Sequence, residues 1–204
     1  MHSSDPVQER AASPAALPPR LKRFGGHVGL LRLLRSGDEP QLQEFFRSHT
    51  ADTIYERYGC LISTMTAERA SQLVNVDQSR DCALGIFEPT PEGEKLHAVG
   101  RYCLDRDGTS AEAAFVVRET MRHQGMATTL LQTLIHTART RGLTKLWAQV
   151  NAQNTEMLAI FRHHGFAVSP QPDIGMMEVA LDLGATPAPP SLPARIKPQK
   201  KKRR

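Results

Sequence analysis

The sequence is poor in cysteine, in aromatic residues and in long apolar runs. Its 3 cysteines, Cys60, Cys82 and Cys103, are an odd number without C-x-x-C spacing, which argues against a disulfide framework and a zinc site. Its 8 histidines form no H-E-x-x-H set, so we expect no metal. No apolar run approaches the roughly 18 residues of a membrane span, and the N-terminal region has no stretch of signal-peptide type. These absences predict a cytoplasmic protein.

The net charge of +5 is unevenly distributed along the 204 residues. Residues 195–204 hold seven basic side chains and no acidic one, whereas residues 28–183 hold 15 basic and 19 acidic residues, a net charge of −4. The basic C-terminal run has two interpretations: salt-sensitive contact with a polyanion, or a solvated chain end without a partner. No aromatic residue is interleaved with the run, so nothing in it supports base stacking.

Proline marks the same boundaries as charge, because nine of the 14 prolines lie outside residues 28–183. Pro-rich segments with few large apolar residues cannot offset the entropy of ordering. We therefore predict a flexible N-terminal segment at residues 1–27, one domain at residues 28–183, and a disordered, Pro-rich and basic tail at residues 184–204.

Hydrophobic periodicity within residues 28–183 predicts a mixed α/β domain. Four helical regions are expected: one after Asp38, which would be the N-cap of that helix, one within residues 52–74, one around residues 130–138 and one after Asn154. The turn at residues 106–109 predicts a hairpin. Strands are expected at residues 28–34, 81–88, 96–105, 111–118, 145–150, 166–168 and 176–183.

The most informative stretch is the loop between the strand at 111–118 and the helix that follows. It reads Arg122-His123-Gln124-Gly125-Met126-Ala127. A helix N-terminus exposes unpaired N–H groups and a partial positive charge, which suits a phosphate or pyrophosphate. The small residues Gly125 and Ala127 allow close backbone approach, and Arg122 adds a cation.

With this loop the sequence resembles the GNAT superfamily of N-acetyltransferases, whose signature is R/Q-x-x-G-x-G/A. The segment Asn151–Asn154 with Met157-Leu158 and His164-Gly165-Phe166 is similar to the second acyl-CoA motif of that family. Residues 33–38, 45–47 and 55–58 are similar to GNAT domains of bacterial protein lysine acetyltransferases. The resemblance implies the GNAT fold: an α/β domain with a mixed central sheet and a splayed strand pair, flanked by helices.

The resemblance also implies a site for acetyl-CoA. Amides of His123 to Ala127 would hold the pyrophosphate, and Val116 and Val117 would pair with the pantetheine amides. The neighbouring strand would splay away, usually with a bulge, and a strand amide could stabilise the oxyanion. Asn154 would contact the cofactor, or serve as a helix N-cap, or both.

The reaction implied is acetyl transfer to an amine, with a protein lysine preferred as acceptor. The alternatives are a small-molecule amine acceptor and a non-catalytic acyl-CoA-binding module. Glu112 is the candidate base, because it lies in an otherwise apolar strand and matches a Glu of the protein-acetyltransferase group; an exposed strand-end glutamate is the alternative interpretation. Glu119 and His123 are weaker candidates. Phe161 stands where many GNAT enzymes have a Tyr that protonates the leaving thiolate, so it is expected in the core.

Overall fold

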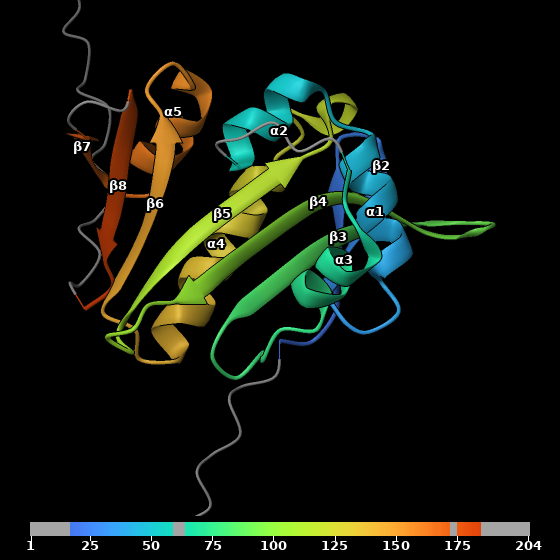
Figure 1. Ribbon diagram of the computed structural model, residues 1–204, viewed down its shortest axis with the longest axis horizontal. Coiled ribbons are helices and arrows are strands. Elements are labelled where there is room, and N and C mark those ends of the chain that lie inside the picture. Colours follow the sequence, from blue (N-terminus) through green and yellow to red (C-terminus); the bar gives the residue numbers. More distant parts are fainter. Residues whose placement is uncertain (1–16, 59–63, 172–174, 185–204) are drawn as a thin grey trace, which may run out of the picture.

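The computed structural model describes residues 17–58, 64–171 and 175–184. Its centre is a sheet of eight strands in the order β1-β2-β3-β4-β5-β6-β8-β7 (Figure 1). The strands are β1 (Arg20–Phe24), β2 (His27–Leu33), β3 (Cys82–Thr90), β4 (Gly93–Leu104), β5 (Ser110–Val117), β6 (Lys145–Asn151), β7 (Ala167–Gln171) and β8 (Met176–Asp182). The helices are α1 (Glu39–Arg47), α2 (Ala51–Tyr58), α3 (Ala67–Val74), the 3-10 turn η1 (Glu119–Met121), α4 (Met126–Thr140) and α5 (Thr155–His163).

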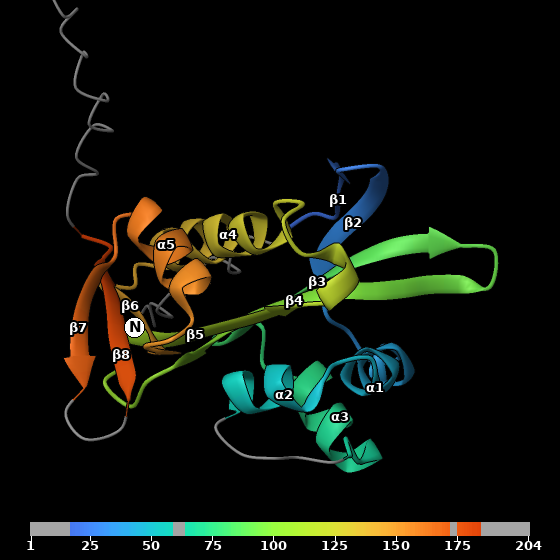
Figure 2. The same cartoon turned by 90° about the horizontal axis from the view of Figure 1, so that it is seen from above.

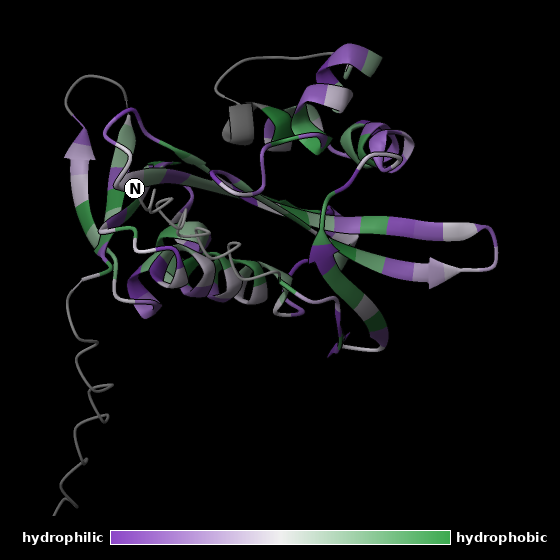
Figure 3. Ribbon diagram, turned by 90° about the horizontal axis from the view of Figure 1, so that it is seen from below, coloured by the Kyte–Doolittle hydropathy of each residue, from purple (hydrophilic) through white to green (hydrophobic). Residues whose placement is uncertain are grey.

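Helices cover the sheet on both faces. Figure 2 shows α4 and α5 on one face and α1, α2 and α3 on the other. The helices carry both hydrophilic and hydrophobic stretches (Figure 3), as expected of helices that bury one side against a sheet. None of the described helices is long and apolar enough to span a membrane.

Two hydrophobic clusters hold these layers together. The larger cluster joins the sheet to α4 and α5 through residues such as Phe115, Leu130, Leu134 and Phe161, all buried. The smaller cluster joins β2, β3 and β4 to α1 and α3. Gly100 lets α4 approach β4 closely, since a Cβ at this position would lie 3.1 Å from the Cβ of Leu130. The two cores fix the sheet between the helices that flank the site.

The folded part begins earlier than the sequence predicts. Strand β1 lies within residues 1–27, the predicted flexible segment, and pairs with β2 over its full length. Phe24 is buried in the larger cluster, so the boundary predicted at residue 27 is wrong for β1. Alternation is hard to see in β1 because only Phe24 of its five residues is buried. Residues 1–16 and the predicted tail from residue 185 onward lie outside the described residues.

The other predicted elements are found close to their expected positions, with two differences. The helical region predicted within residues 52–74 is two helices, α2 and α3. Asp38 precedes α1 as predicted, but its carboxylate makes no capping hydrogen bond. It accepts two hydrogen bonds from the buried guanidinium of Arg32, at 2.7 and 2.8 Å. An ion pair between β2 and the α1 start therefore replaces the expected cap.

Candidate active site

Strands β5 and β6 form a fork. They are the parallel pair of the sheet, and they pair only from Ser110 to Glu112 on β5 and from Lys145 to Trp147 on β6. Beyond Glu112 the two strands diverge, so the splayed pair expected from the resemblance is present. The remainder of β5 pairs with β4 alone, which leaves one edge of this strand open.

The register of β4 and β5 decides which backbone groups face the gap. Asp105 donates to the carbonyl of Ser110 at one end of the ladder, and Arg118 donates to the carbonyl of His97 at the other, both at 2.8 Å. Hydrogen-bonded pairs alternate in an antiparallel ladder, so Val116 directs its backbone groups to Val99 on β4. The N–H and C=O groups of Phe115 and Val117 face the gap.

This register corrects the backbone role predicted for Val116. The backbone groups of Val117 face the gap, and the next residue along the open edge whose groups do so is Phe115, two residues away. The expected bulge is also displaced: the β4–β5 register is continuous, and the shift lies between β3 and β4 at Ile86 and Phe87. There Ile86 pairs with Ala98 and Phe87 with Leu96, so His97 is the extra residue. The fork therefore opens without a bulge on β5.

A cleft of about 1030 Å³ occupies the fork. It extends from Glu112 along β5 to the start of α4, and α5 and β6 form its other wall. Of the residues predicted to bind acetyl-CoA, together with Glu112 as the preferred base, all but one line this cleft: Glu112, Val116, Val117, Arg122, His123, Gly125, Met126, Ala127 and Asn154. The exception is Gln124. Its side chain lies against Gly25, where an added Cβ would come within 2.8 Å of the Gln124 amide oxygen.

The loop before α4 has the geometry of an anion-binding nest. His123 has φ +60° and Gly125 φ +83°, and a non-glycine residue at positive φ is uncommon. In the part of the chain that the structure describes, the backbone N–H groups of residues 123–128 have no hydrogen-bond acceptor. The first turn of α4 also lacks an acidic residue, unlike those of α1, α2, α3 and α5. Successive free N–H groups at a helix start suit a pyrophosphate.

The charged side chains of this loop are held loosely at the mouth of the cleft. Arg122 donates to the hydroxyl of Thr53 on α2 at 2.8 Å. His123 lies 3.8 Å from Glu156 on α5, and both side chains are mostly exposed. Nothing in the sequence pattern marks Thr53, because its contact with Arg122 joins residues 69 positions apart. Arg122 can therefore turn to an anion by giving up one neutral partner.

Asn154 and Phe161 both have the structural roles considered for them. Asn154 is the N-cap of α5, and its side-chain oxygen accepts from the Met157 amide at 3.0 Å. Phe161 is 2% exposed. Its ring contacts those of Phe115 and Phe166, with centroid separations of 5.4 and 4.8 Å. The position where many GNAT enzymes carry a Tyr is here part of the apolar cleft wall.

Glu112 lies at the point where the fork opens. Side chains alternate along β5: Ala113, Phe115 and Val117 belong to the core below α4, whereas Val116 packs against the cluster of α1 and α3. Glu112 shares the face of Val116, and it is exposed. Its carboxylate is thus on the sheet face opposite α4 and α5, where an acceptor can reach the end of the cleft.

Glu119, the weaker candidate for the base, is tied to α2 instead. It accepts hydrogen bonds from the Thr50 amide at 3.0 Å and from His49 Nδ1 at 3.1 Å. Partial burial raises the pKa of Glu119, but hydrogen bonds from Thr50 and Thr53 and the attraction of His49 outweigh it and lower the pKa to about 2. Burial lowers the pKa of His49. A carboxylate with so low a proton affinity is a poor general base, so this interpretation of Glu119 is not supported.

Solved structures of known proteins share this fold. The GNAT domain of S. lividans PAT is 21% identical and superposes with a TM-score of 0.72, covering 80% of this chain and 96% of that one. The structure of yncA from Salmonella typhimurium with its cofactor acetyl-CoA is 19% identical, with a TM-score of 0.60, covering 79% and 98%. RimL, a ribosomal L7/L12 alpha-N-protein acetyltransferase in complex with coenzyme A, is 14% identical, with a TM-score of 0.61, covering 80% and 98%.

These likenesses confirm the predicted fold, an α/β domain with a mixed sheet flanked by helices. The family is shown by the sequence, because residues 43–166 match the model of the acetyltransferase (GNAT) family. That match spans more than half of the chain and includes the fork, the loop before α4 and both walls of the cleft. The chain belongs to the GNAT acetyltransferase family.

Proposed function

We propose that the protein is an N-acetyltransferase that moves an acetyl group from acetyl-CoA to an amine, with a protein lysine as the preferred acceptor. The observation that carries this proposal is a cleft that has an open β5 edge, free loop amides at one end and Glu112 at the other. An extended ligand with an anionic group at one end and a reactive group at the other fits such a cleft.

The residues present fit acetyl-CoA along its length. The N–H groups of residues 123–128 and the guanidinium of Arg122 would hold the pyrophosphate. The backbone groups of Phe115 and Val117 would pair with the pantetheine amides. The pantetheine would thus take the place beside β5 that β6 leaves open. One of these N–H groups is also available to the thioester oxygen as negative charge develops on it. Acetyl-CoA supplies the activated acetyl group.

The acceptor presents a proton problem that Glu112 can solve. A lysine amine has a pKa of about 10.4, so at pH 7 roughly one molecule in 2,500 is neutral, a cost of about 4.6 kcal/mol. Glu112 would take the proton directly or through water as the nitrogen bonds to the acetyl carbon and the carbon–sulfur bond breaks. Phe161 cannot donate a proton, so the thiolate would take one from water.

The choice of protein lysine rests on the N-terminal likeness described in the sequence. Residues 33–38, 45–47 and 55–58 are similar to those of GNAT domains of bacterial protein lysine acetyltransferases. The exposed position of Glu112 also favours a bulky acceptor, because a side chain can reach it from the open sheet face.

The test is release of coenzyme A thiol from acetyl-CoA by the full-length protein. It is incubated with lysine peptides, folded proteins and small amines, and acetyl-CoA binding is measured by calorimetry in parallel. We expect binding, and faster release with lysine peptides than with small amines. Preference for a small amine would overturn the acceptor assignment. Binding with no release for any amine would favour a non-catalytic acyl-CoA module, in line with Phe161. Absence of binding would refute both functions.

A further inference from the structure

We propose that Trp147 and Glu112 together form the subsite that receives the acceptor ammonium, and that this subsite selects long alkylamines such as the lysine side chain. The proposal rests on the proposed function, since it describes how the acceptor of that reaction is held. Trp147 belongs to none of the motifs in the sequence. It lies on β6 but is not among the residues that line the cleft.

The two side chains are neighbours across the sheet. Glu112 is paired with Trp147 on β6 and with Cys103 on β4, so the three form one row across the strands. Residues paired in this way point to the same face and have Cβ atoms about 5 Å apart. Glu112 is exposed and Trp147 is partly exposed. An indole ring therefore stands beside the candidate base at the point where the fork opens.

Trp147 is held in place by its own hydrogen bond. Its indole Nε1 donates to a carboxylate oxygen of Asp105 at 2.7 Å. Asp105 directly follows β4, and Trp147 lies on β6. Because β5 lies between these two strands, the hydrogen bond runs across β5. A ring whose polar edge is satisfied in this way is an ordered platform for a ligand.

The surface around the ring already holds an ammonium group. Lys145 Nζ lies 6.0 Å from the centroid of the Trp147 ring and 3.4 Å from a carboxylate oxygen of Glu178. This is the combination of an aromatic face and a carboxylate that recognises alkylammonium ions. The carboxylates of Asp105, Glu112 and Glu178 lie along this face with two cations, Lys145 and Arg101, whose guanidinium donates to the Cys103 sulfur at 3.1 Å. Three carboxylates against these two cations favour a positively charged ligand at this face.

Nothing in the described part of the chain covers this face. Helices α1, α2 and α3 lie over the half of the sheet formed by β2 to β5, whereas β6, β8 and β7 extend beyond them (Figure 2). An aliphatic chain can thus lie along the indole while its ammonium reaches Glu112. An amine carried on a short or rigid group would not span both side chains. This arrangement favours a flexible alkylamine over compact amines.

The structure offers an unusually direct binding test, because Trp147 is the single tryptophan of the chain. Its fluorescence is recorded with coenzyme A present while capped lysine amide is added, with capped norleucine amide as the uncharged control. We expect a saturable change with lysine and at least a tenfold weaker one with norleucine. Equal responses to the two would overturn the proposal, because the charge would then not be recognised.

The second test measures the KM for lysine while the electron density of the indole ring is lowered in steps. Replacing the single tryptophan biosynthetically with mono- and difluorotryptophan weakens the ring quadrupole without changing its shape. We expect the KM for lysine to rise stepwise, and Trp147→Leu to raise it roughly 3- to 30-fold. Trp147→Phe should remain within about threefold of the wild type. The KM for acetyl-CoA should not change in any of these proteins.

The outcomes separate this inference from the proposed function. If no amine releases thiol from acetyl-CoA, the proposed function itself fails. If thiol is released but the KM for lysine is the same across the fluorinated series, only the Trp147 subsite is refuted. A lower KM for lysine within a peptide than for capped lysine amide identifies a protein acceptor, and the reverse identifies a free alkylamine bound by the same chemistry.

Discussion

Substitution of Glu119 by Gln removes one charge from the joint between η1 and α2 and leaves its size unchanged. The carboxylate holds the Thr50 amide at the start of α2 and the buried ring of His49. These contacts lie next to Thr53, the partner of Arg122. The joint therefore connects the helix on the acceptor side to the loop that we assign to pyrophosphate.

The size of the effect follows from the pKa of Glu119. The fold lowers this pKa from 4.5 to about 2, and each pKa unit corresponds to about 1.4 kcal/mol, so the upper limit is about 3 kcal/mol. The Glu119 side chain is 26% exposed, and screening by solvent reduces the contribution. We expect the free energy of unfolding at pH 7 to fall by about 1–2 kcal/mol in Glu119→Gln.

The pH dependence gives this prediction its sign. A carboxylate with a lowered pKa in the folded state stabilises the protein above its unfolded pKa, and this stabilisation is lost as pH falls through the folded value. Here it is complete above about pH 4.5 and declines toward pH 2. The difference between wild type and Glu119→Gln should therefore shrink steadily below pH 4.5.

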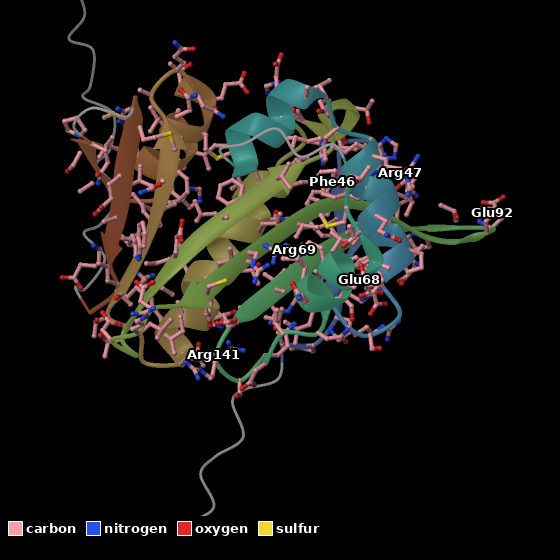
Figure 4. All side chains as sticks on the ribbon, viewed as in Figure 1. Phe46, Arg47, Glu68, Arg69, Glu92 and Arg141 are labelled. Atoms are coloured by element: carbon pink, nitrogen blue, oxygen red, sulfur yellow. The ribbon has the colours of Figure 1, made fainter. Side chains whose placement is uncertain are left out.

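Urea denaturation at pH 7, 5, 4 and 3 measures this difference directly. Glu92→Gln is the matched control, because Glu92 lies at the tip of the β3–β4 hairpin (Figure 4), where it is exposed. It should change the free energy of unfolding by less than about 0.5 kcal/mol at every pH. A loss in Glu119→Gln that stays constant from pH 7 to pH 3, or no loss at pH 7, would refute the role of the Glu119 charge.

Two further predictions concern α4. Gly100→Val should lower the free energy of unfolding in urea by about 1–3 kcal/mol, because its Cβ would press on Leu130. The control Gly26→Val, whose Cβ meets nothing within 4 Å, should lower it less. Equal losses in the two variants would contradict the close approach of α4. Arg122→Ala should weaken acetyl-CoA binding roughly 10- to 100-fold in calorimetry, by losing one charged hydrogen bond. The control Arg139→Ala, at the far end of α4, should leave it unchanged, and an equal effect of both would mean that only net charge matters.

The sequence predicts most of the fold because its elements are locally encoded. The alternation in β5 and the apolar face of α4 identify both elements, and Gly142 and Gly165 follow the helices with positive φ, as helix ends favour. Strand β1 was missed because only one of its five residues is buried. The split between α2 and α3 was missed because both halves have helical periodicity.

The candidate site was predictable only where a motif is continuous. The loop at residues 122–127 and Glu112 were found from local sequence, and nearly all the predicted residues line one cleft. Whether Val116 or Phe115 faces the gap depends on the register between β4 and β5, which local pattern does not fix. Thr53 and Trp147 come from other elements, and only the tertiary structure brings them to the loop and to Glu112.

The most direct test of acetyl transfer in this cleft compares wild type with Glu112→Gln. Thiol release is measured at pH 7 with saturating acetyl-CoA and a lysine peptide, with Glu92→Gln as a control expected to match the wild type. A general base contributes roughly 10²- to 10⁴-fold, so we expect kcat to fall by that factor while acetyl-CoA binding is unchanged. Full turnover by Glu112→Gln would contradict the assignment of Glu112 as the base.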